Sequence, residues 1–273
     1  MERMELHQSD LLLLETCGEA YRRRVIERQF RPSNVRMMVG TAVHAGREVN
    51  LAQKVTSGKD LEETAVTEAA RDRVVEGFAE DQVELESEFD GLPKRAVRDQ
   101  AVDTAVSLAR LDYHHFQEPM RPTAVEASIA VRLQNYPFDI GMRLDVIEEL
   151  PDGGTAVRDA KTSKRTPAKT VAETSEQLAL YSLGARAFCQ RPIAEASLDY
   201  LVALKSGPKA VRFATVVSEQ DERAILQRLA MAYEATAKGV FVPASQGHWK
   251  CSETWCEYWR DCPYVIGRRR PEN

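Results

Sequence analysis

Two acidic residues and one lysine occur close together where the chain alternates in the manner of β-strands. Asp145 ends the segment Gly141-Met142-Arg143-Leu144-Asp145, and Asp159 and Lys161 lie in Val157-Arg158-Asp159-Ala160-Lys161. Because successive side chains of a strand point to opposite faces, Asp159 and Lys161 project from the same face. Carboxylate oxygens suit Mg²⁺ or Mn²⁺, and a lysine beside them can orient or activate water that attacks phosphorus. Such a pair is common by chance, so an ordinary ion pair on an edge strand is the alternative.

The surrounding pattern predicts how these residues meet. Alternating apolar residues and turn signals predict three successive strands: Val125–Leu133, Asp139–Glu149 and Thr155–Thr162. Asp152-Gly153-Gly154 is typical of a tight hairpin turn, which makes the second and third strands antiparallel neighbours. The carboxylates of Asp145 and Asp159 can therefore converge. Glu126, at the start of the first strand, is interpreted as an ordinary exposed acid, since such acids are common on strands.

The remaining elements predict an α/β or α+β fold in which helices flank a mixed central sheet. Helices are expected at Ser9–Glu27, Val35–Lys54, Asp60–Glu88, Lys94–Phe116, Ala168–Phe188 and Glu219–Lys238, and further strands at Ala194–Leu204 and Ala210–Val217. Ser9 and Ser218 are the expected N-caps of the first and last helix. We divide the chain into a helical region (1–118), a core (119–240) and a cysteine-rich tail (241–273), packed as one integrated domain.

The ordered motifs resemble those of the RecB-like PD-(D/E)XK nuclease family. That family carries an acid on one strand, D/E-x-K on the next, and a Q-x-x-x-Y helix, which Asp145, Asp159-Ala160-Lys161 and Gln177-Leu178-Ala179-Leu180-Tyr181 match. Gly40-Thr41-Ala42-Val43-His44 resembles its first motif. One departure is Met142, which stands where the family usually has glycine.

The resemblance implies a restriction-endonuclease-like core and a metal-dependent DNA nuclease. It implies that Mg²⁺ or Mn²⁺ is held by four groups: His44, Asp145, Asp159 and the Ala160 carbonyl. It also implies that Lys161 positions the attacking water, and that Gln177 and Tyr181 orient Lys161 or its strand. Exonuclease activity on single-stranded ends, in recombination, repair, or CRISPR or phage DNA processing, is expected from the family, with a helicase or recombinase as a possible partner. A structure-specific endonuclease and a non-catalytic DNA-binding module are the alternatives.

Four of the five cysteines predict a metal centre. Cys251, Cys256 and Cys262 lie close together in the tail, and Cys17 is the candidate for a fourth ligand. The set resembles that of AddB-type nucleases and the CRISPR-adaptation nuclease, which implies a [4Fe–4S] cluster joining the two ends of the chain. Two details differ from these nucleases. Four residues separate Cys251 from Cys256, where two are more usual, and Gly18 stands after Cys17, where proline is common. Four thiolates also suit a structural Zn²⁺. Cys189 is expected in the core.

Composition agrees with a globular protein that has no broad basic surface. The 273 residues are 43% hydrophobic and 29% charged, with a net charge of −5. The sequence shows neither a secretory signal nor an apolar run long enough to cross a bilayer, so we expect a cytoplasmic location and no membrane partner. Positive residues gather near the predicted site: Arg158, Lys161, Lys164, Arg165 and Lys169. These groups and bound cations can attract DNA locally.

Overall fold

The structure, a computed structural model, describes residues 3–253 and 255–266. Its central sheet contains six strands: β1 (Met4–Leu6), β4 (Pro122–Arg132), β5 (Phe138–Glu149), β6 (Thr155–Ser163), β7 (Ile193–Val202) and β8 (Lys209–Thr215). The strand order is β1-β5-β6-β7-β8, and β4 also pairs with β5. Parallel pairs (β1 with β5, β6 with β7) and antiparallel pairs occur together. The mixed sheet predicted from the sequence is confirmed.

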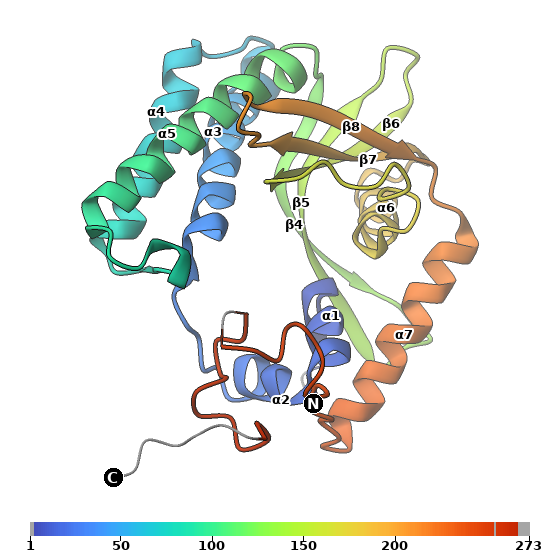
Figure 1. The fold of residues 1–273 in the computed structure, drawn as a ribbon. Coiled ribbons are helices and arrows are strands. Elements are labelled where there is room, and N and C mark those ends of the chain that lie inside the picture. The colour runs from blue at the N-terminus through green and yellow to red at the C-terminus, as the bar shows by residue number, and fades with distance from the viewer. Residues whose placement is uncertain (1–2, 254, 267–273) are drawn as a thin grey trace.

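The sheet is covered on both faces by helices. These are α1 (Gln8–Thr16), α2 (Gly18–Tyr21), α3 (Val35–Ser57), α4 (Glu63–Ala79), α5 (Lys94–Asp112), α6 (Glu176–Cys189) and α7 (Glu219–Ala237). Helices α3, α4 and α5 lie together to one side of the sheet (Figure 1). Val146 of β5 packs with these helices, whereas Leu144 and Ile147 pack with residues of α1, α6 and α7. Within the described ranges, no helix has both the length and the apolar content to span a membrane.

Strand β5 has an open stretch along one edge. Strand β4 pairs along one edge of β5, so β1 and β6 both pair along its other edge. Strand β1 pairs with Phe138–Ile140, and β6 pairs with Val146–Glu149. The segment Gly141–Asp145 lies between these two partners, where β5 and β6 separate. The sheet therefore parts beside Asp145.

Helix α3 begins and ends at residues suited to its termini. The Asn34 side chain accepts a hydrogen bond from the Met37 N–H at 2.8 Å, and Gly58 ends the helix with φ 70°. Most predicted helices and strands are present, but two predicted helices are shorter. Helix α4 ends at Ala79, before a small parallel pair of strands, β2 (Ser33–Asn34) and β3 (Val83–Glu84). Helix α6 starts only at Glu176, capped by Ser175.

The single N-terminal helix expected from Ser9 to Glu27 was wrong. His7 is the N-cap, and Cys17 has extended backbone (φ −162°, ψ 104°), which separates α1 from α2; a π-helical turn (Arg22–Ile26) follows. The Gly18 N–H donates to the Val242 carbonyl at 2.7 Å, and a side chain at Gly18 would overlap the backbone at Phe241 and Val242. The break thus gives the C-terminal tail its place against α2, as Figure 1 shows.

Candidate active site

The separation of β5 and β6 places Asp145 opposite the D-x-K segment. The last paired residues of these strands are Val146 and Arg158. Beyond this pair, the Ala160 N–H donates to Asp145 Oδ2 at 2.9 Å. The Asp145 side chain thus replaces a backbone hydrogen bond between β5 and β6. Asp145 is 7% exposed and Asp159 only 1%. The predicted convergence of the two acids is therefore present.

Lys161, Gln177 and Tyr181 gather around Asp159. Lys161 Nζ lies 2.7 Å from Asp159 Oδ2, as expected for side chains on one strand face. From α6, Gln177 Nε2 donates to Asp159 Oδ1 at 3.0 Å and to the Tyr181 hydroxyl at 2.8 Å. Asp159 Oδ2 is buried and accepts no well-formed hydrogen bond, although the lysine ammonium lies beside it. A buried carboxylate oxygen of this kind is suited to a cation.

His44 reaches the site from α3. Its Nε2 is 3.0 Å from the Ala160 carbonyl oxygen, and its Nδ1 is 3.2 Å from Asp145 Oδ2. Helix α3 thus presents the imidazole to β5 and β6 together. All residues predicted for the hydrolytic site, including Ala160, lie in this one region.

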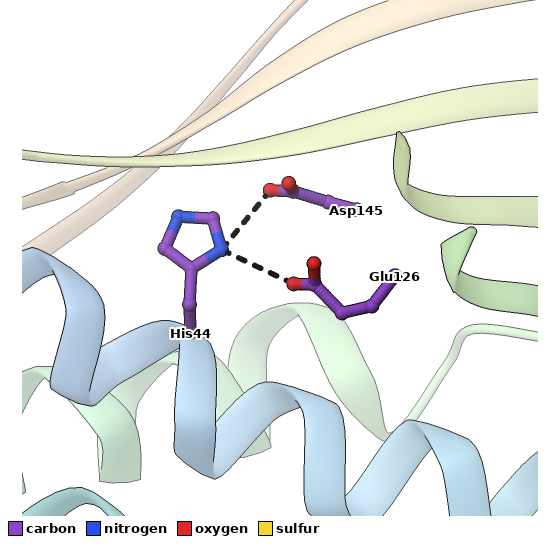
Figure 2. A group of neighbouring side chains, drawn as sticks. All are labelled: His44, Glu126 and Asp145. Atoms are coloured by element: carbon purple, nitrogen blue, oxygen red, sulfur yellow. Dashed lines mark ion pairs between the residues drawn. The ribbon is translucent and has the colours of Figure 1, made fainter. Parts of the chain in front are cut away.

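Glu126 also belongs to this group, and the sequence interpretation of it as an exposed acid was wrong. Figure 2 shows its carboxylate facing His44 Nδ1. The two groups are 3.7 Å apart, and the Glu126 side chain is 13% exposed. One ligand atom each of His44, Glu126 and Asp145 lies within 4.8 Å of the others. Glu126 lies on β4 between Val125 and Ala127, whose β5 partners flank Asp145. Glu126 and Asp145 stand equally far from the Asn135–Tyr136 turn, and counting from it would have identified Glu126.

The electrostatics show that the site concentrates negative charge. Burial lowers the pKa of His44, but the Asp145 and Glu126 carboxylates outweigh burial and raise this pKa to about 9. Burial and the Asp145 carboxylate raise the pKa of Asp159 to about 7. Burial also raises the pKa of Asp145, against the effect of His44. Burial would lower the pKa of Lys161, but Asp159 raises it, so the lysine is an ammonium. Acids this close together favour a bound cation.

Two buried ion networks support the strands beneath the site. Arg47, one turn after His44, contacts Asp112 at 2.8 Å and Asp199 at 2.9 Å. Asp199 pairs with Ala160 in the β6–β7 ladder, so this contact ties α3 to the sheet. Arg158 is 2% exposed and pairs with Glu148. The sequence-based prediction that Arg158 is a positive group available to DNA is therefore wrong, because its side chain is buried.

Met142, at the family's usual glycine position, is accommodated by a glycine elsewhere. Gly184 of α6 lies against the Met142 thioether, and a side chain at Gly184 would overlap the Met142 sulfur. Met142 is 8% exposed and packs in the core that α6 shares with the sheet. Gly184 on α6 thus leaves the space that the Met142 side chain of β5 occupies.

The four candidate cluster cysteines lie at one place, where the tail packs on the N-terminal helices. The Ala244 N–H contacts Cys17 Sγ at 3.4 Å. Burial raises the pKa of Cys256, and so do the nearby thiols of Cys17, Cys251 and Cys262. Contacts from the tail, such as Arg23 to Asp261 at 2.9 Å, hold the two ends together. Cys189, by contrast, is the last residue of α6 and packs against the core. Residues 267–273 of the tail lie outside the described residues.

Comparisons with known proteins identify a family for this chain. The sequence model of a family described as the PD-(D/E)XK nuclease superfamily matches residues 5–263. No curated protein matches the chain. A solved structure described as "Crystal structure of SSO0001" is 14% identical in sequence, with a TM-score of 0.36; the match covers 93% of this chain and 96% of that one.

Proposed function

We propose that this chain, which belongs to the PD-(D/E)XK nuclease superfamily, is an exonuclease that shortens DNA from free ends and prefers single strands. Its family implies a metal-dependent nuclease acting on DNA. One observation carries the assignment of the site: Asp145, Asp159 and Lys161 converge where β5 and β6 part, with His44 and Glu126 beside them.

The residues present fit a divalent cation. His44, Glu126 and Asp145 offer ligand atoms close together, and the buried carboxylate of Asp159 lies near that of Asp145. When the imidazole is neutral, Nε2–H can donate to the Ala160 carbonyl, which leaves the Nδ1 lone pair for ligation. We assign these four residues and the Ala160 carbonyl as the groups that hold Mg²⁺ or Mn²⁺. A bound ion would polarise the phosphoryl group and activate water.

The chain's own groups position the reactants. The Lys161 ammonium is fixed by Asp159 and is still partly exposed, with 35% of its side chain accessible. It can therefore orient the attacking water and stabilise charge that develops on the phosphate oxygens. Gln177 fixes Asp159 Oδ1 and the Tyr181 hydroxyl at once, which holds the carboxylate's second oxygen towards the lysine.

The distribution of positive charge supports a single strand as substrate. With a net charge of −5, the protein has no general excess of positive charge to attract duplex DNA. Three exposed positive residues follow β6, the strand that carries Asp159 and Lys161: Lys164, Arg165 and Lys169. A narrow strand passing the site would meet these groups.

The four gathered cysteines support a [4Fe–4S] cluster as a structural clamp. Cys17 and the tail cysteines supply the four thiolates that such a cluster needs. Closing so long a loop restricts the unfolded chain, so the cluster would stabilise the fold. Protein purified without oxygen should contain iron and acid-labile sulfide in equal amounts. Stoichiometric zinc without sulfide would replace this proposal by a Zn²⁺ site.

The experiment for the activity compares two forms of one single strand, closed and linear, with Mg²⁺ and with Mn²⁺. The linear strand, labelled at one end, should be shortened progressively while the circle survives. Cleavage of both forms at equal rates would identify an endonuclease instead. Binding of the linear strand without cleavage under either ion would identify a non-catalytic DNA-binding module.

A further inference from the structure

A cleft lies between helices α3 and α5, next to the end of β6. Its volume is about 390 Å³, within the range of small-ligand pockets. Apolar side chains form most of its lining: Val35, Val39, Phe89, Val97, Leu108 and Ala203. Gln100, Thr104 and Thr162 add polar groups to this wall. The cleft thus has apolar surface for a flat ring and hydrogen-bonding groups for its edge.

Two cations, one from α3 and one just after β6, stand at the cleft and share one carboxylate. Arg36 of α3 contacts Glu88 Oε2 at 2.7 Å, and Lys164, just after β6, contacts Glu88 Oε1 at 3.2 Å. The side chains of Arg36 and Lys164 are 40% and 60% exposed. An anion held between an arginine and a lysine occupies the position that a backbone phosphate would take. Solvent can reach this position.

The cleft lies next to the candidate active site. Gly40 lines it one helical turn before His44, about 6 Å along the axis of α3. Thr162, on its other wall, follows Lys161 in β6. An atom added at Gly40 would lie 3.1 Å from Thr162 Oγ1, so the two walls approach closely here. A group in the cleft would be the near neighbour of one bound at the metal site.

An exposed aromatic pair lies beyond Arg36. The Arg36 guanidinium lies over the Trp255 ring, 5.5 Å from its centroid, and Trp255 meets Trp249 edge-on at 5.6 Å. Both indoles are at least half exposed. The cleft is therefore flanked by the hydrolytic site on one side and by ring surfaces on the other, which suits a chain of bases.

We propose that this cleft receives one unpaired base of the DNA strand being cut, with Arg36 and Lys164 binding the adjoining phosphate in place of Glu88. The inference rests on the proposed nuclease function, and it assigns single-strand preference to a particular site. A base can enter an apolar cleft only when it is free of its partner strand, since paired bases are stacked inside the duplex. Duplex DNA would have to lose pairing first.

The test measures binding without cleavage. Ca²⁺ replaces Mg²⁺, and single-stranded DNA carries the fluorescent base 2-aminopurine at successive positions. One position near the cut end should show quenched fluorescence, because its base stacks in the cleft. Thr104→Phe fills the cleft from α5, and should remove that quenching and weaken binding about tenfold. Thr64→Phe, the same exchange on an exposed part of α4, is the control and should change neither.

The exposed cations give a second test that does not depend on repacking the cleft. In the double variant Arg36→Ala with Lys164→Ala, the slope of log K against log salt should fall by about 0.7 for each phosphate that is no longer bound. Glu88→Gln should tighten binding, because it removes the competing carboxylate. An unchanged slope, or unchanged quenching in folded Thr104→Phe, would overturn the inference. Cleavage of the same DNA by the unaltered protein with Mg²⁺ is scored separately, so failure of the nuclease function remains distinguishable.

Discussion

Arg47 gives the sharpest prediction about how the fold holds its site. Its guanidinium is 2% exposed and lies between Asp112 and Asp199, which are both fully buried. In Arg47→Leu, Asp199 would keep Arg212 at 2.6 Å. Asp112 would keep only the Gln117 amide at 2.7 Å. One buried carboxylate is therefore left without any cation.

Removing one partner of a buried ion pair costs about 3–5 kcal/mol. Because Asp199 keeps a second cation, we expect Arg47→Leu to cost about 3 kcal/mol, which lowers Tm by roughly 10 °C for a chain of this size. Burial raises the pKa of Asp112 and Arg47 lowers it, so this pKa should rise further in the variant. A folded-state pKa above the unfolded value destabilises the fold at higher pH. The deficit should therefore shrink as the pH falls.

Thermal and chemical unfolding at several pH values measure this effect. The double variant Arg47→Leu with Asp112→Leu should be more stable than the sum of the two single changes, because it leaves no lone charge. Arg110→Leu, which removes an exposed arginine of α5, is the control and should change Tm little. A deficit in Arg47→Leu no larger than that of the control, or one independent of pH, would refute the reasoning.

Other predictions concern the site and the cluster. Asp159→Asn and Lys161→Ala should each abolish DNA cleavage with unchanged circular dichroism, and wild-type rates in both would exclude this site. Glu126→Gln should weaken Mn²⁺ binding at least about tenfold in calorimetry, whereas unaltered affinity would remove Glu126 from the ligands. Cys17→Ser should lose the metal of the tail and melt earlier, and Cys189→Ser should do neither; a Cys17 variant with full metal content and Tm would exclude that cysteine.

The part of the site that depends on local pattern could be predicted from the sequence. The hairpin at Asp152–Gly154 fixes which strands are neighbours, and strand alternation places Asp159 and Lys161 on one face. Gln177 and Tyr181 are one helical turn apart, so they share a face. Such relations need only short stretches of chain.

The parts that depend on distant segments could not be predicted. Glu126 is the exception, because counting from the Asn135–Tyr136 turn places it opposite Asp145, although its left-handed φ of 49° is rare outside glycine. The break at Cys17 arises because the tail, more than two hundred residues later, packs on Gly18. Strand β1 is only three residues long and gains its place by pairing with β5. Residue pattern alone does not predict the contacts of Gly18 with the tail or of β1 with β5.

Asp145→Asn is the decisive variant for the metal site. Asparagine keeps an oxygen to accept the Ala160 N–H but removes the charge that a cation needs. Mn²⁺ binding, followed by its electron paramagnetic resonance, and release of label from linear single-stranded DNA are measured on the same samples. Asp152→Asn, on the exposed hairpin turn, is the matched control. We predict that Asp145→Asn loses both Mn²⁺ binding and cleavage at unchanged Tm, while the control keeps both. Cleavage by Asp145→Asn at the control's rate would contradict the assignment of this site as a metal-dependent nuclease centre.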